Sequence, residues 1–114
     1  MTRKVEQAMV AAIQANKDWK SGNTSVETTE GVSKVFLHGN HIATIGEDFM
    51  ELFDGGWQSK TTKSRINALC DAFCVAGEGV FQKNFQWFFR KFTGQMGDQK
   101  VFTTIEFESG MLLS

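Results

Sequence analysis

Apolar residues near the N-terminus recur with the spacing of a single helical stripe. Between residues 3 and 16 the stripe consists of Val5, Ala8, Met9, Ala12 and Ile13. Their i, i+3, i+4, i+7 and i+8 spacing predicts an α-helix, with Thr2 as a candidate N-cap. A second stripe consists of Ile66, Leu69, Cys70 and Phe73. It predicts a helix from Thr62 to about Gly77, for which Thr61 or Thr62 is the candidate cap.

Outside these two stripes, apolar and polar residues alternate with the period of two that is typical of β-strands. The first helix is followed by strands at Thr24–Thr28, Ser33–His38, His41–Ile45 and Phe49–Phe53. The second is followed by strands at Val80–Lys83, Gln86–Phe92 and Val101–Phe107, and by an apolar tail, Met111–Leu113, that could add an edge strand. Two short turns, Gly39-Asn40 and the one around Asn84, predict hairpins. We therefore expect an α+β fold: an N-terminal helix, an antiparallel four-strand meander, a second helix, a hairpin and a last strand, with the helices packed on the sheet.

Composition narrows the class of protein. A chain of 114 residues that is 41% apolar and has a net charge of -1 predicts one soluble domain spanning residues 1–114. No segment approaches the roughly 20 apolar residues of a membrane helix, and polar residues interrupt the N-terminal segment where a signal peptide would be apolar. Cys70 and Cys74 lie four apart in a predicted helix, which suits two reduced thiols better than a disulfide. These features predict a cytoplasmic protein without a membrane segment.

Charge is distributed unevenly along the chain. Residues 1–56 carry a net charge of -3, residues 57–100 carry +4 and residues 101–114 carry -2. The basic central region contains Lys60, Lys63, Arg65, Lys83, Arg90, Lys91 and Lys100, interleaved on the second hairpin with Phe85, Trp87, Phe89 and Phe92. Cations beside rings are typical of surfaces that bind single-stranded nucleic acid, because phosphates meet the cations and bases stack on the rings. The alternative is an ordinary solvated face whose rings belong to the core.

The segment Asp54–Thr61 (DGGWQSKT) ends like a phosphate-binding loop and lies between a predicted strand and a predicted helix. Such a loop needs glycine at its first and sixth positions, so that backbone amides can wrap a phosphate. Asp54 and Ser59 occupy these positions, and the aspartate would repel the ligand. We therefore interpret the segment as a strand-to-helix turn.

The cysteines and histidines favour neither a metal site nor nucleophilic catalysis. Four residues could be imagined as metal ligands: Cys70, Cys74, His38 and His41. Structural zinc sites usually hold their cysteines on a knuckle or ribbon, whereas Cys70 lies on the apolar stripe of a helix. A catalytic thiolate needs a helix N-terminus or a neighbouring cation, and these cysteines lie in the middle and at the end of their helix. We predict no enzyme activity, no metal and no cofactor.

Four segments carry a family resemblance: SGNTSV (Ser21–Val26), LHGNHIA (Leu37–Ala43), GWQSKTTKSRINAL (Gly56–Leu69) and VFQKNFQWF (Val80–Phe88). In these segments the chain resembles a group of small, mostly uncharacterised proteins encoded by tailed bacteriophages, and the resemblance covers about residues 19–113. It implies a viral origin and a product made in the cytoplasm of the infected bacterial host. The group has no catalytic motif, so the resemblance assigns no catalytic role to any residue.

Together these observations predict a small non-enzymatic phage accessory protein that binds a macromolecular partner, with nucleic acid as the first to test. The predicted contact residues are Lys60, Lys63, Arg65, Asn67, Lys83, Arg90 and Lys91. The alternative is a protein-directed inhibitor of a host polymerase or a host defence complex, which would present the acidic residues Glu47, Asp48, Glu51 and Asp54. The apolar tail and a free sheet edge would also allow a homodimer.

Overall fold

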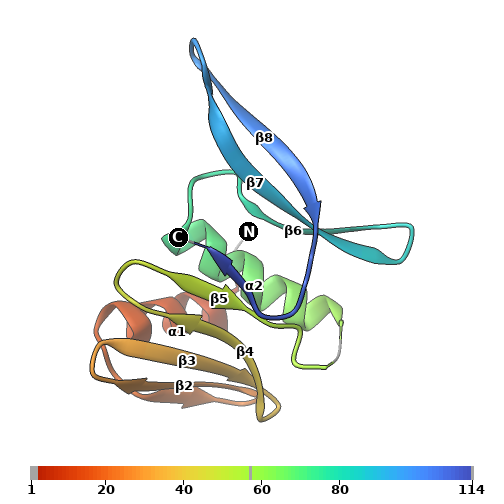
Figure 1. The fold of residues 1–114 in the computed structure, drawn as a ribbon. Helices are drawn as coiled ribbons and strands as arrows, with labels where there is room; N and C mark the ends of the chain where they lie inside the picture. The colour runs from red at the N-terminus through yellow and green to blue at the C-terminus, as the bar shows by residue number, and fades with distance from the viewer. Residues whose placement is uncertain (1–2, 57, 114) are drawn as a thin grey trace.

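The computed structural model describes residues 3–56 and 58–113 of the chain, and these residues contain two helices and nine strands (Figure 1). Their order is α1 (Lys4–Gln14), β1 (Trp19–Ser21), β2 (Thr24–Thr29), β3 (Val32–Leu37), β4 (Asn40–Ile45), β5 (Met50–Leu52), α2 (Lys60–Phe73), β6 (Gly79–Lys83), β7 (Gln86–Met96), β8 (Gln99–Glu106) and β9 (Met111–Leu113). The predicted α+β fold and its order of elements are confirmed.

The strands form two antiparallel sheets. The first has the order β1-β2-β3-β4-β5-β9 and the second the order β6-β7-β8. Helix α2 lies between the sheets, and β7 and β8 form a long arm that projects beyond the rest of the molecule (Figure 1). The tail returns to the first sheet as its edge strand β9, with Leu113 opposite Met50. At the other edge, Trp19 belongs to β1 and pairs with Val26.

One hydrophobic core joins both helices to both sheets. Its buried members include Met9 and Ile13 of α1, Val35 and Leu37 of β3, Ile66 and Leu69 of α2, and Trp87 and Phe89 of β7. The helical stripes predicted from the sequence therefore face the core, as their spacing requires. Within the described ranges, no helix has both the length and the apolar character of a membrane span.

Helix α2 begins with a side-chain cap two or three residues earlier than expected. Ser59 is the N-cap, and its hydroxyl accepts a hydrogen bond from the backbone amide of Thr62 at 3.1 Å. The prediction of Thr61 or Thr62 as the cap is wrong, because Thr62 is a buried residue of the first turn. The other candidate cap, Thr2 of the first helix, lies outside the described residues.

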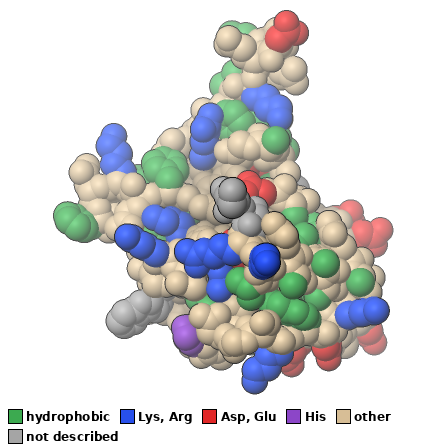
Figure 2. Space-filling model, turned by 180° about the vertical axis from the view of Figure 1, so that it is seen from behind, with side chains coloured by type: hydrophobic (Ala, Val, Ile, Leu, Met, Phe, Trp, Pro, Cys, Tyr) green, Lys and Arg blue, Asp and Glu red, His purple; other side chains and the backbone are tan. Residues whose placement is uncertain are grey.

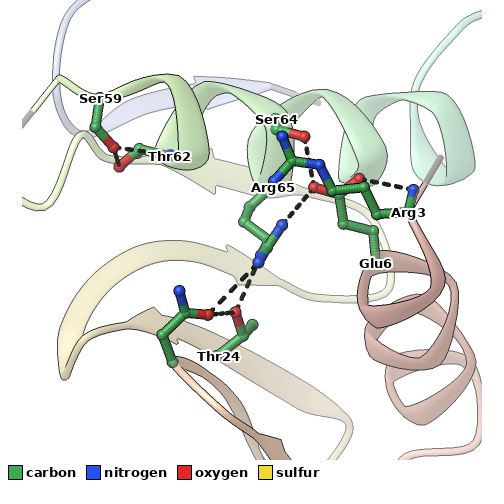
Figure 3. A network of polar contacts seen from close by, with 8 residues as sticks. Arg3, Glu6, Thr24, Ser59, Thr62, Ser64 and Arg65 are labelled. Atoms are coloured by element: carbon green, nitrogen blue, oxygen red, sulfur yellow. Dashed lines mark hydrogen bonds and ion pairs between the residues drawn. The ribbon is translucent and has the colours of Figure 1, made fainter. Parts of the chain in front are cut away.

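A buried carboxylate joins α1 to α2. Glu6 Oε2 lies 2.7 Å from Nη1 of Arg65, and the two side chains are 3% and 5% exposed (Figure 3). The same oxygen accepts a hydrogen bond from the hydroxyl of Ser64 at 2.6 Å, and Glu6 Oε1 accepts one from the backbone amide of Arg3 at 3.2 Å. A charge withdrawn from water in this way is tolerated only when it is paired and hydrogen-bonded.

The guanidinium of Arg65 extends the same network to the first sheet. Its Nε donates to the hydroxyl of Thr24 at 3.0 Å, and its Nη2 lies 3.5 Å from Oδ1 of Asn23 (Figure 3). Thr24 begins β2 and is itself fully buried. One ion pair therefore fixes both helices and the start of β2 relative to one another.

The first prediction concerns loss of this pair. Replacing the carboxylate in Glu6→Gln leaves the buried guanidinium of Arg65 without a counterion, which costs about 3–5 kcal/mol. Urea denaturation should show a loss of this size, whereas Glu47→Gln at an exposed position should change stability by less than about 0.5 kcal/mol. The double variant Glu6→Leu/Arg65→Met removes both charges and should be more stable than Glu6→Gln. An unchanged unfolding midpoint in Glu6→Gln would contradict the assigned role.

The second prediction is a pH dependence with a defined sign. Burial raises the pKa of Glu6, but hydrogen bonds from Ser64, Arg65 and Arg3 and the charge of Arg65 outweigh it, so the pKa lies below the ordinary value of 4.5. Stability from this group is therefore complete above pH 4.5 and is lost as the pH falls through the lowered folded-state pKa. Thermal melts across this range should show a larger loss for the wild type than for Glu6→Gln; equal losses would refute the assignment.

Candidate functional site

One face of α2 carries two of the predicted contact lysines. Lys60, Lys63 and Asn67 occupy positions i, i+3 and i+7, which share a side of the helix. The amide of Asn67 donates to the carbonyl of Val80 at 2.9 Å, and its oxygen accepts from the Val80 backbone amide at 2.7 Å. This face therefore runs along β6. Asn67 was predicted to be free for a partner, and that prediction is wrong because both ends of its amide are bonded to β6.

Strand β6 runs back toward the N-terminal end of α2 (Figure 1). It ends at Lys83, which is exposed, so this cation lies toward the same end of the helix as Lys60 and Lys63. Lys60 is exposed and Lys63 is half-buried. The strand therefore places lysines that are about twenty residues apart in the sequence toward the same end of α2.

The turn between β6 and β7 presents a ring to solvent. Asn84 and Phe85 both have left-handed backbone conformations, with φ angles of 52° and 64°. The side chain of Phe85 is 95% exposed, and it is the only phenylalanine or tryptophan side chain that is exposed in the part of the chain that the structure describes. Phenylalanine is disfavoured in this conformation, which two-residue hairpins usually reserve for Asn and Gly. Neither backbone preference nor burial explains a ring at this position.

The other rings predicted to interleave with the cations face inward. Trp87 is 2% exposed and Phe89 is fully buried, because both alternate onto the core side of β7. Phe92 is half-buried and packs edge-on against Phe102, at 5.9 Å between ring centroids. The expectation of a row of stacking rings along the second hairpin is therefore wrong, and only Phe85 is available at its tip.

Arg90 and Lys91 lie on opposite faces of β7, so they do not act together. The guanidinium carbon of Arg90 lies 4.2 Å from the centroid of the Phe102 ring, a cation–π contact. Arg90 also lines a shallow groove of about 680 Å³ that includes Asn67 and Val80. The side chain of Lys91 instead lines a separate groove of about 360 Å³ together with Glu47, Asp48 and Glu78. Arg90 therefore belongs with the Asn67 side of the molecule, and Lys91 does not.

Arg65 is not a contact residue. It is 4% exposed and is committed to the network with Glu6 and Thr24, so the prediction that it faces a partner is wrong. The sequence held a signal for this arrangement. Glu6 lies three residues before Met9 on the stripe of α1, and Arg65 lies four residues before Leu69 on the stripe of α2. Opposite charges on two buried stripes indicate an internal ion pair.

We define the cationic face as the exposed and half-buried cations on this side of the molecule: Lys60, Lys63, Lys83 and Arg90. Figure 2 shows Lys and Arg side chains gathered across the middle of one face, with a hydrophobic side chain at the far left, where the β6–β7 hairpin ends. Apart from Glu6–Arg65, the described residues form no ion pair, so no carboxylate neutralises these four cations directly. Asp71 and Glu78 line the groove next to Arg90 and limit the face on that side.

The remaining candidate chemistry is accounted for by local structure. The carboxylate of Asp54 accepts a hydrogen bond from the backbone amide of Gly56 at 2.8 Å, so an acidic group occupies the turn before α2. Nε2 of His41 pairs with the Thr44 hydroxyl at 2.7 Å. A hydrogen bond with Cys74, together with burial, raises the pKa of the Cys70 thiol. In residues 3–56 and 58–113, no three groups that ligate metals come together. Trp57, which lies within the segment Asp54–Thr61, is outside the described residues.

Comparison with known proteins gives one match. A family model described as "Kyanoviridae Gp96 protein" matches residues 2–114. No curated protein and no solved structure matches the chain significantly.

The third prediction follows from the geometry of the β6–β7 turn. Phe85→Gly should stabilise the protein by about 1 kcal/mol, because glycine adopts the left-handed conformation without strain and the exposed ring contributes no packing. The measurement is the urea midpoint, with Phe89→Gly as a buried control that should be severely destabilised. A loss of stability in Phe85→Gly would show that the ring packs in solution.

Proposed function

The chain belongs to the Kyanoviridae Gp96 protein family, and from this premise we propose that it is a non-enzymatic phage accessory protein that binds single-stranded nucleic acid through the cationic face. It would act in the cytoplasm of the infected bacterial host. Membership of a phage protein family supports the viral origin, and the side chains of the cationic face support the binding activity.

The observation that carries the proposal is the exposed ring of Phe85 beside Lys83 at the tip of the β6–β7 hairpin. Exposure of the whole ring and a left-handed backbone are both unfavourable for phenylalanine, so folding does not account for its presence. A ring can stack on an unpaired base while an adjacent lysine meets the phosphate. Stacking of this kind requires an unstacked base, which favours single strands over duplex.

The lysines of α2 extend this contact. Lys60 and Lys63 lie one helical turn apart at the positive end of the helix dipole, where an anion is favoured. Lys83 at the end of β6 lies toward the same end, so a strand that stacks on Phe85 can pass the three lysines in turn. Arg90 adds a fourth cation farther along β7. This arrangement reads no base edges, so we expect binding with weak sequence preference.

The fourth prediction is loss of binding on charge reversal. Lys60→Glu/Lys63→Glu should abolish binding of a fluorescent single-stranded oligonucleotide, measured by anisotropy at low salt. The melting temperature should not fall, because acidic residues in the first helical turn are favourable. Lys34→Glu on β3, an exposed lysine remote from α2, is the matched control and should bind almost as the wild type does. Phe85→Gly should weaken binding by roughly 5- to 150-fold, the range of one lost base stack.

Salt gives an independent readout. Four phosphate contacts predict a slope of about -3 for log affinity against log salt concentration. Wild-type affinity weaker than millimolar at low salt would overturn the proposal. Recovery of a single stoichiometric protein from nuclease-treated lysate, together with no oligonucleotide binding, would favour the protein-directed inhibitor instead.

A further inference from the structure

Strand β8 is a long edge without a partner on its outer side. It is the last strand in the order β6-β7-β8 and pairs with β7 along its length. In the described part of the chain no strand pairs with its other side, and it belongs to the arm that projects from the body (Figure 1). Its unpaired amides and carbonyls are a template for another strand.

The sequence of β8 lacks the usual protection of an edge strand. Natural edges are blocked by proline, by charges in the middle of the strand or by a bulge. The register shift in this ladder falls between Phe92 and Gly94 of β7, and not within β8. The centre of β8, Val101–Ile105, contains only β-branched residues and phenylalanine. Val101 is 41% exposed, and Met96 on the same arm is 76% exposed. An edge of this composition is expected to be covered by a partner strand.

The ends of β8 carry opposite charges that the chain itself leaves unpaired. Lys100 is the second residue of the strand and Glu106 is its last. Across the ladder to β7 they face Gln95 and Phe88, and neither forms an ion pair within the described residues. Among residues 3–56 and 58–113, the only polar contact of Lys100 is a long one, 3.5 Å from Nζ to the carbonyl oxygen of Ala76.

Two copies of β8 fit one another in a single register. An antiparallel pair of identical strands is related by a two-fold axis perpendicular to the sheet, and partners across the pair point to the same face. Successive side chains of a strand point to opposite faces, so two partners must both be odd-numbered or both be even-numbered. The axis must therefore pass through a residue and not between two residues. An axis through Thr103 places Lys100 opposite Glu106 of the second copy. The same axis places Val101 opposite Ile105 and Phe102 opposite Thr104. Both charges are then paired, and every central residue meets a residue suited to strands.

The two neighbouring registers pair the residues of β8 less favourably. An axis through Phe102 places Lys100 opposite Thr104 and brings Glu106 to Asp98, an acidic residue in the turn before β8, so neither charge is paired. An axis through Thr104 leaves only five residues of β8 in the ladder and places Phe102 opposite Glu106. The charges at the two ends of β8 therefore select the register centred on Thr103.

We propose that the protein forms a homodimer by antiparallel pairing of β8 with β8 of a second copy, about a two-fold axis at Thr103. The two three-stranded sheets then become one continuous six-stranded sheet. The Lys100–Glu106 pair forms twice, once at each end of the shared ladder. This inference is independent of nucleic-acid binding, because it uses no residue that defines the cationic face.

The fifth prediction tests the pairing by charge exchange. Sedimentation equilibrium over a range of concentrations should show a monomer–dimer equilibrium for the wild type. Lys100→Glu places two glutamates opposite each other at both ends, and Glu106→Lys does the same with two lysines. Each should raise the dimer dissociation constant about tenfold or more. Lys34→Glu, outside β8, should leave it unchanged.

Two rescue measurements separate this pairing from other causes. The double variant Lys100→Glu/Glu106→Lys restores opposite charges and should dimerise as the wild type does. An equimolar mixture of the two single variants should form a heterodimer that is tighter than either homodimer. A wild type that is monomeric at every concentration, a dimer insensitive to Lys100→Glu, or single variants that fail to associate when mixed would each overturn the proposal. Circular dichroism of each variant verifies that the fold is retained.

Discussion

The Glu6–Arg65 ion pair is the constraint from which the arrangement of the molecule follows. A carboxylate and a guanidinium removed from water each cost several kcal/mol, and only mutual contact with full hydrogen bonding offsets that cost. Here the partners come from α1, α2 and the start of β2. The apolar stripe of α2 turns Ile66 and Leu69 toward the core. The contacts of the Arg65 guanidinium with Glu6 and Thr24 fix the rotation of the helix about its axis.

That rotation determines which residues of α2 reach the surface. Because Arg65 points inward, the side of the helix that carries Lys60, Lys63 and Asn67 points toward β6. Asn67 then fastens this side to Val80, and β6 leads to the hairpin tip with Lys83 and Phe85. One side of α2 therefore carries the buried network, and another side carries lysines of the cationic face. The network positions these lysines because it fixes how the helix is turned.

The fold was largely predictable from the sequence because its elements follow the periods of 3.6 and 2 that packing imposes. The candidate site was less predictable from the sequence than the fold. Arg65 was read as a surface cation since charge alone does not reveal a distant partner, and Glu6 is 59 residues away. Phe85, Trp87 and Phe89 share the same alternation, so the sequence could not distinguish them. Only the position of the turn, with Phe85 in a left-handed conformation, separates the exposed ring from the two buried ones.

The pairing of β9 with β5 has a consequence for how the molecule assembles. Met50 and Leu113 are neighbours in the sheet but are separated by most of the second half of the chain, so the loop that their contact closes is costly in entropy. Contacts of this range form only after that entropy has been lost, which slows folding. Until they form, β5 is an open edge beside the hydrophobic centre of the first sheet. An unpaired edge next to apolar surface is a place at which chains aggregate.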